Sequence, residues 1–231
     1  MTGYYTMVTL EDAKQVSDEI VRRFKPVSIT VFGSVARNGT GNDLDIMVIV
    51  DESRSSPDVV SRSVQSQLKN CYRHFAIDPF VFGLATAHRQ LKTGSPFLNM
   101  VLDEGVIVYM KNAFNEWNRN AAEDLAMAKH LLNGNFFRGA CYNAQQAIEK
   151  TMKAQLLAKG WLLEKIHNVR RLAVLCEEYK CPFDIPDEDI SFLDSIYRSR
   201  YPAETGLLPQ GEPGKEDVLR AIDCAERVMK K

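Results

Sequence analysis

The sequence predicts an α/β (α+β) domain with a short mixed sheet, followed by an all-α antiparallel helical bundle. Up to about residue 110, short β-branched runs alternate with amphipathic stretches, a pattern typical of layered α/β structure. Beyond that point the strand signal disappears, and apolar residues recur at helical spacing between short turns, which favours a bundle. We therefore expect two domains, residues 1–110 and 111–231.

The first half contains four runs rich in β-branched and aromatic residues, and each is expected to form a strand. These runs are Val27–Phe32, Leu44–Val50, Phe75–Phe82 and Val106–Tyr109. Apolar residues from Leu10 to Phe24 recur at helical spacing, and Thr9 is suited to be the N-cap. A second helix is expected from Pro57 through Leu68, because proline is favoured in the first turn of a helix.

The second half contains five stretches with helical apolar spacing. They cover residues 117–132, 137–156, 169–179, 189–198 and 216–229. The first should end at the Asn133–Asn135 turn and the second near Gly160. Between the last two stretches, residues 202–214 are too rich in proline and glycine to be helical.

Composition and charge are those of an ordinary globular protein of 231 residues, with 45% apolar and 26% charged residues. The net charge is -1, and neither half has the positive excess expected of a dedicated nucleic-acid binder. The chain begins without a signal-peptide pattern and has no apolar run long enough to span a membrane. Five scattered cysteines are expected to be buried free thiols. We expect a cytoplasmic protein with no membrane partner.

The candidate site begins where a predicted strand ends at Gly33-Ser34. A flexible polar turn is expected next, and the following strand opens with Asp43 and Asp45. Because strand side chains alternate, both carboxylates should project from the same face. Mg²⁺ takes oxygen ligands and commonly one or two carboxylates. A glycine beside a serine hydroxyl lets the backbone approach a triphosphate closely.

Asp78 offers a third carboxylate, inside the apolar run Phe75–Phe82. If it is buried or half-buried, its charge needs a partner, and a metal is the strongest one available. Three carboxylates on two cations suit in-line nucleotidyl transfer, with Asp78 as metal ligand or as base for the acceptor. Each piece alone also fits a turn or a solvated strand edge, and Pro79 favours an edge position. The conjunction of the pieces, in this order, is what favours a site.

This constellation resembles the minimal nucleotidyltransferases of the DNA polymerase β superfamily, over about residues 25 to 110. The resemblance implies three catalytic carboxylates that bind two Mg²⁺ ions: Asp43, Asp45 and Asp78. It also implies three residues that contact ATP or another nucleoside triphosphate: Gly33, Ser34 and Arg37. Eight residues separate Ser34 from Asp43, slightly fewer than is usual in these proteins.

The second half resembles a HEPN domain, the helical partner of many minimal nucleotidyltransferases. The resemblance rests on Trp117, Ala144–Lys150 with Lys153-Ala154, His167-Asn168 and Arg200–Pro202. It implies a homodimer formed through the helical domain. Some HEPN domains are ribonucleases that use an arginine followed four to six residues later by a histidine. None of the four histidines here follows an arginine at that spacing, so we expect no ribonuclease of that kind.

Further polar residues of the second half have alternative interpretations. Residues Gln145, Gln146, Glu149, Lys150 and Lys153 should form one polar strip. The strip is either a solvated face or the lining of a cleft that meets the nucleotide or acceptor. We expect His167, at a helix start, to pack or cap. Tyr197 and Tyr201 offer hydroxyl acceptors, although tyrosines near a helix end usually pack.

Taken together, these features predict Mg²⁺-dependent transfer of AMP from ATP to a hydroxyl of an unidentified acceptor, which is a protein, a small molecule or an RNA end. An antibiotic-modifying enzyme of the aminoglycoside type is one alternative. A regulatory protein of the toxin–antitoxin type, or a silent nucleotide sensor, is another. The presence of all three carboxylates disfavours the sensor, because three close anions are costly to keep without a function.

Overall fold

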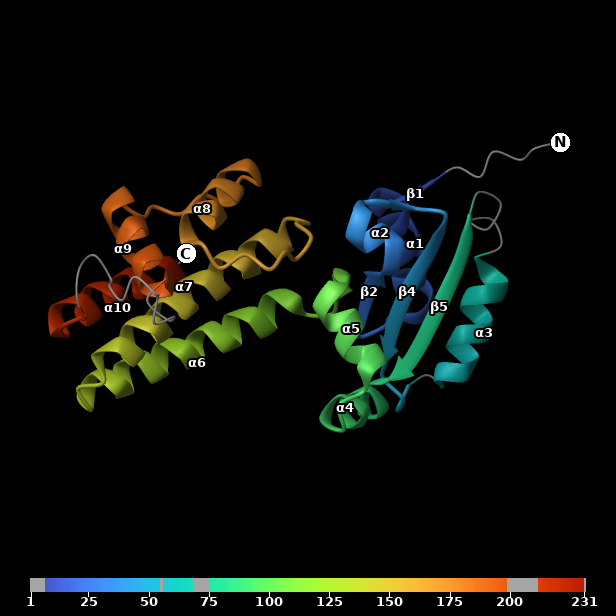
Figure 1. Cartoon of the computed structure of the whole chain (residues 1–231), viewed down its shortest axis with the longest axis horizontal. Coiled ribbons are helices and arrows are strands. Elements are labelled where there is room, and N and C mark those ends of the chain that lie inside the picture. The colour runs from blue at the N-terminus through green and yellow to red at the C-terminus, as the bar shows by residue number, and fades with distance from the viewer. Residues whose placement is uncertain (1–6, 55, 69–74, 199–211, 231) are drawn as a thin grey trace. The chain divides into compact units, whose positions relative to one another are not determined.

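The computed structural model describes residues 7–54, 56–68, 75–198 and 212–230. Backbone packing divides the chain into two compact units, residues 1–111 and 112–231 (Figure 1). Expectations for Cys71, His74, Arg200 and Tyr201, and for most of the 202–214 loop, lie outside the described residues. Within the described part of the chain, no helix has the length and apolar character needed to cross a membrane.

A four-stranded mixed sheet forms the centre of the N-terminal unit, in the order β5-β4-β2-β6. Its strands are β2 (Ser28–Phe32), β4 (Asp43–Val50), β5 (Ala76–Gly83) and β6 (Val106–Met110). Strand β2 is antiparallel to both β4 and β6, whereas β5 is parallel to β4. A separate two-stranded ribbon pairs β1 (Val8–Thr9) with β3 (Thr40–Gly41). The predicted mixed sheet is confirmed, and all four predicted strands form it.

Helices α1 (Leu10–Phe24) and α3 (Pro57–Gln67) cover one face of the sheet. Thr9 begins α1 as predicted, because its hydroxyl accepts a hydrogen bond from the Asp12 N–H. In return, the Thr9 N–H donates to the Asp12 carboxylate at 2.9 Å, which completes a capping box.

Helices α4 (Leu84–Lys92) and α5 (Pro96–Glu104) cover the opposite face, and neither was predicted. The N-cap residue of α4 is Gly83, which has no side chain to cap the helix. Glu52 caps it instead, because its carboxylate accepts from the N–H groups of Ala85 at 2.9 Å and Thr86 at 3.2 Å. A Cβ on Gly83 would lie 1.9 Å from the Glu52 Oε1 atom, so a side chain at position 83 would displace this capping carboxylate.

The C-terminal unit consists of the five predicted helices packed around one apolar core. They are α6 (Ala113–Asn133), α7 (Phe137–Ala158), α8 (Val169–Glu178), α9 (Asp187–Arg198) and α10 (Lys215–Met229). Helices α6 and α7 run side by side along their lengths (Figure 1). Asp194 of α9 ties α8 in place, because its carboxylate accepts from the Val169 N–H at 2.7 Å. The helical bundle is therefore confirmed.

Candidate active site

Three predicted site residues lie on the face of the sheet that α4 and α5 partly cover. Phe32 pairs with Asp45 across β2 and β4, and Asp45 pairs with Asp78 across β4 and β5. Because directly paired residues point to the same side of a sheet, Phe32, Asp45 and Asp78 form one row. Asp43 lies two residues before Asp45 and therefore shares its face. The topology thus brings the three predicted carboxylates to one end of two neighbouring strands.

Gly33 lies directly against this row. Its φ of +70° is in the left-handed region, and a Cβ there would lie 2.2 Å from the Asp45 Oδ2 atom. A side chain at position 33 would therefore be disfavoured twice, by backbone strain and by collision with the carboxylate. Glycine is required here because the backbone turns next to Asp45.

The Ser34 hydroxyl lies in close contact with the backbone of Gly41. Its hydroxyl is buried and has no hydrogen-bond partner among the described residues. A Cβ on Gly41 would lie 2.2 Å from that hydroxyl oxygen. Residues 33–38 form a short helix, α2 (Gly33–Asn38), so the prediction of a flexible turn here was wrong. Backbone hydrogen bonds between residues four apart, such as Gly39 N–H to the Val35 carbonyl, hold this segment in a helix. The helix ends at Gly39, whose φ of +77° is in the left-handed region.

The environment of Asp45, including the other two aspartates, changes its pKa. Burial raises the pKa of Asp45, and the negative charges of Asp43 and Asp78 raise that pKa further, whereas Arg37 lowers it. Asp78 itself is exposed, so the condition under which its charge would need a partner, a buried or half-buried position, is not met. The reason is the topology, because β5 is an edge strand of the sheet and leaves one side of Asp78 to solvent. The edge position that Pro79 indicated is observed.

The residues present fit a divalent cation, although their side chains are not gathered into a ready ion cage. Within the described ranges, no three His, Cys, Asp or Glu side chains already lie close enough to hold an ion. The donors on this face are carboxylate and hydroxyl oxygens, the ligand type that Mg²⁺ prefers. A cation beside Asp45 would also offset the repulsion that raises its pKa.

Arg37 lies near the carboxylates but is paired elsewhere. Its guanidinium donates to Glu104, at the end of α5, with an N–O distance of 2.8 Å. Both side chains are exposed, and an ion pair in water contributes little stability. The Arg37 guanidinium can therefore leave Glu104 at little cost in free energy and bind a more highly charged phosphate.

The polar strip predicted on α7 is largely buried, so the first of its two interpretations, a solvated face, does not hold. Gln145, Glu149 and Lys153 are 0%, 2% and 3% exposed. The Lys153 ammonium donates to Glu149 at 2.8 Å and lies 5.6 Å from the centre of the Trp117 ring. These side chains form hydrogen bonds and an ion pair with one another inside the helical unit. The spacing of polar residues along one helix could not predict those contacts.

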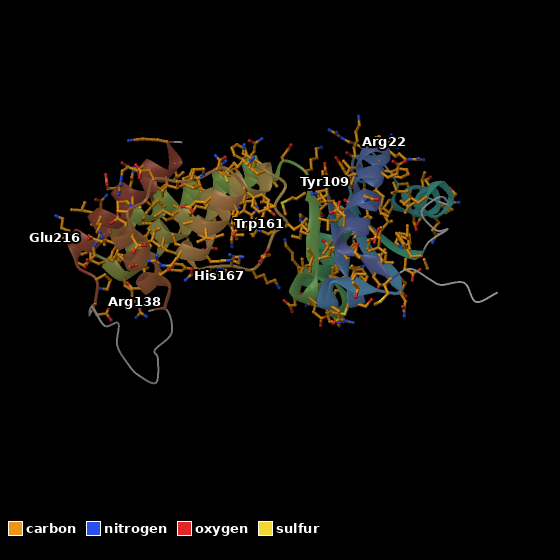
Figure 2. The ribbon with its side chains drawn as sticks, turned by 90° about the horizontal axis from the view of Figure 1, so that it is seen from above. Arg22, Tyr109, Arg138, Trp161, His167 and Glu216 are labelled. Atoms are coloured by element: carbon orange, nitrogen blue, oxygen red, sulfur yellow. The ribbon has the colours of Figure 1, made fainter. Side chains whose placement is uncertain are left out.

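His167, labelled in Figure 2, contacts this network with a side chain that is 43% exposed. Its Nδ1 atom lies 3.1 Å from the Glu149 Oε1 atom, and its backbone carbonyl accepts from Gln145 at 3.4 Å. His167 therefore holds the segment before α8 against α7. The sequence prediction assigned it a packing or capping role, and the cap itself comes from the neighbouring Asn168, whose side chain accepts from the Arg171 N–H.

A family match gives the class of the N-terminal unit. Residues 13–83 match the family described as nucleotidyltransferase domain. The N-terminal unit is a nucleotidyltransferase, an enzyme that transfers phosphorus-containing groups. Residues 114–231, more than half of the chain, match the family described as HEPN domain. The chain thus belongs to the HEPN family and carries a nucleotidyltransferase domain before its HEPN domain. No curated protein matches it significantly.

Three solved structures are similar to the chain, two over about half of it and one over nearly all of it. An archaeal HEPN homologue is 27% identical and covers 52% of this chain and 94% of its own, with a TM-score of 0.39. A protein of Thermus thermophilus is 21% identical and covers 52% of this chain and 95% of its own, also with a TM-score of 0.39. A nucleotidyltransferase-like protein of Exiguobacterium sibiricum is 10% identical and covers 94% of this chain and 74% of its own, with a TM-score of 0.35.

Proposed function

We propose that the N-terminal unit transfers a nucleoside monophosphate, AMP from ATP, to a hydroxyl of an acceptor in a Mg²⁺-dependent reaction. The observation that carries this proposal is Asp45, whose pKa is raised by burial and by the charges of Asp43 and Asp78. A carboxyl with a raised pKa beside two further carboxylates on one face is typical of a functional site. The cost of keeping them together is offset if they bind a cation together.

The residues around the row are suited to bind the triphosphate. The Gly33 backbone passes beside Asp45 with no side chain in the way, and the buried Ser34 hydroxyl has a hydrogen bond to give. Arg37 can leave Glu104 and contact a phosphate. We assign Gly33, Ser34 and Arg37 to the nucleotide, and Asp43, Asp45 and Asp78 to two Mg²⁺ ions.

In the reaction, the acceptor oxygen forms a bond to the α-phosphorus, and the bond from that phosphorus to the bridging oxygen of pyrophosphate breaks. The exposed Asp78 carboxylate is the group that can take the acceptor proton, because it is the most accessible member of the row. Bound Mg²⁺ supplies charge neutralisation for pyrophosphate and lowers the pKa of the acceptor hydroxyl. The protein's own contribution is to position both reactants.

For the C-terminal unit we propose a binding and assembly role, as the part of a homodimer that contacts its second copy. His167 of this unit lies against the buried Glu149 carboxylate, and this contact supports a structural role for His167. We also propose that the two packing units, residues 1–111 and 112–231, correspond to the two domains.

The test is incubation of the purified protein with Mg²⁺ and each α-³²P-labelled nucleoside triphosphate, alone and with cell extract. Wild type and Asp45→Asn are compared, and Glu123→Gln on the exposed side of α6 is the matched control. We expect label on an acceptor with wild type and with the control, and none with Asp45→Asn. Nucleotide binding without any transfer would favour a sensor, and transfer by a folded Asp45→Asn variant would refute the site.

A further inference from the structure

An exposed aromatic side chain lies on the same face as the carboxylates. Phe80 is 40% exposed, and it follows Asp78 by two residues on β5. Side chains two apart on a strand share a face and are separated by about 6.6 Å, at roughly 3.3 Å per residue. In the sheet register Phe80 pairs with Met47, the residue two beyond Asp45. Phe80 therefore lies one row along from the Asp45–Asp78 row.

Phe80 is the outer member of a cluster of aromatic rings. Its ring centre lies 5.4 Å from that of Phe32 and 5.2 Å from that of Phe97, at the start of α5. Phe32 and Phe97 are in edge contact at 5.5 Å, and Phe32 is only 5% exposed. The inner rings belong to the core under α5. They fix the orientation of Phe80 and leave part of its surface to solvent.

The order of the rows places this ring opposite the triphosphate segment. Strand β2 ends at Phe32, in the row of Asp45, and Gly33-Ser34 continue beyond that row. Phe80 lies on the other side, level with Met47 and Thr30. The carboxylates therefore lie between the segment assigned to the phosphates and the exposed ring. A nucleotide that is held by its phosphates at Gly33-Ser34 and extends across the carboxylates would place its base on the side of Phe80.

We propose that Phe80, supported by Phe97, is the stacking platform for the base of the nucleoside triphosphate. This inference rests on the proposed function of the same site. A planar base matches the chemistry of an exposed ring beside anionic groups, because stacking needs only an aromatic face and adds no charge. A peptide or lipid partner would need a larger apolar area than one ring that is 40% exposed.

The platform sets a specificity as well as an affinity. Stacking tolerates every base, since each has an aromatic face, but a purine offers more area to the ring than a pyrimidine does. The site should therefore prefer purine nucleotides, and the preference should depend on the aromatic ring at position 80.

The test compares two ligands by calorimetry in the presence of Mg²⁺: α,β-methylene-ATP, which cannot be cleaved at the reacting bond, and inorganic tripolyphosphate, which has no base. Phe80→Ala should raise the Kd for the ATP analogue about tenfold, as expected for the loss of one stacking contact. Its Kd for tripolyphosphate should equal that of wild type. Phe80→Trp should keep the wild-type affinity for the analogue.

Two further variants make the comparison decisive. Phe80→Leu keeps an apolar side chain against Phe32 and Phe97, and it should lose affinity like Phe80→Ala if the aromatic face matters. Phe136→Ala removes a ring that is 66% exposed at the start of α7, and it should change neither Kd. Unchanged analogue binding in Phe80→Ala, or an equal loss for both ligands, would overturn the platform. If wild type binds neither ligand, the proposed function itself fails.

Discussion

Carboxylates in the two units differ in whether a nearby positive charge neutralises them. Burial raises the pKa of Asp45 most, the like charges of Asp43 and Asp78 raise it further, and its ionised form is therefore costly to the fold. Glu149 and Lys153 are almost fully buried but neutralise each other at 2.8 Å. The first arrangement is suited to bind an added cation, and the second is complete without one.

Replacement of Asp45 by Asn should stabilise the metal-free protein while it removes activity. A raised pKa means that folded Asp45 binds its proton more tightly than the unfolded chain does, so ionised Asp45 lowers stability at pH values above its unfolded pKa. Asp45→Asn removes that charge and should raise the Tm at pH 7 by a few degrees. The measurement is thermal unfolding with and without Mg²⁺. Mg²⁺ should raise the Tm of wild type only, and a lower Tm for the variant without metal would contradict this account.

Lys153→Met should destabilise the helical unit by about 3–5 kcal/mol, because the buried Glu149 carboxylate would lose the ammonium that neutralises it. Urea unfolding of the purified variant measures the change in unfolding free energy. Arg119→Met is the control, since Arg119 pairs with Glu116 on the exposed surface of α6 and should lose less than about 1 kcal/mol. Equal losses in the two variants would show that the burial of the Lys153–Glu149 pair has no energetic weight.

Among the elements, α4 shows how a helix can depend on a residue far away in the sequence. Its start is capped by Glu52, which lies 33 residues before Ala85. The Ala85 N–H bond is the main cause that lowers the pKa of Glu52 below its usual 4.5, and the Thr86 N–H adds to it. The ionised carboxylate thus holds α4 on the same face of the sheet as the aspartates.

Glu52→Gln should lower the Tm by a few degrees near neutral pH, and this difference from wild type should disappear in acid. Because the folded pKa is depressed, the contribution of Glu52 is present above its unfolded pKa of about 4.5 and is lost as the pH falls through the lower folded value. The measurement is the Tm of both proteins between pH 7 and pH 3. The exposed Glu123→Gln serves as control, and a pH-independent difference for Glu52→Gln would refute the electrostatic cap.

These examples also show how far the sequence predicted the structure. Local signals sufficed for α1, because Thr9 and the apolar spacing lie within the element itself. The row of carboxylates followed from strand alternation in Asp43–Val50 and from the aspartate of the next strand. Helix α4 was missed because its cap is distant, and the exposure of Asp78 could not be predicted because it depends on strand order. The α7 network depends on contacts with Trp117 and His167 from other segments.

On the scale of the whole molecule, the chain is two units with separate cores. Buried residues of the sheet and its helices form two clusters in the N-terminal unit, and a third cluster fills the helical unit. The helical core includes Cys141 and Cys224, and desolvation raises the pKa of these thiols to about 12 and about 11. Since each unit buries its own apolar surface, each has its own source of stability.

Calorimetry should therefore resolve two unfolding transitions, and ligand should shift only one of them. Mg²⁺ with α,β-methylene-ATP should raise the transition of the N-terminal unit, by mass action on its folded state, and leave the other in place. Lys153→Met identifies the second transition, because that substitution should lower only the helical unit. A single cooperative transition that shifts as a whole with ligand would show that the units unfold together.

The position of Asp78 on an outer strand has a kinetic consequence. Among the described strands, β5 is hydrogen-bonded to β4 alone, and Pro79, beside the aspartate, has no N–H to contribute. Amide hydrogens of β5 should therefore exchange with deuterium sooner than those of β4, which has a partner on each side. Each opening of β5 moves Asp78 away from Asp45 while Asp43 and Asp45 keep their places on β4. A nucleotide would then face three carboxylates while β5 is paired and two while it is open, and the exchange rate at β5 reports how often the strand opens.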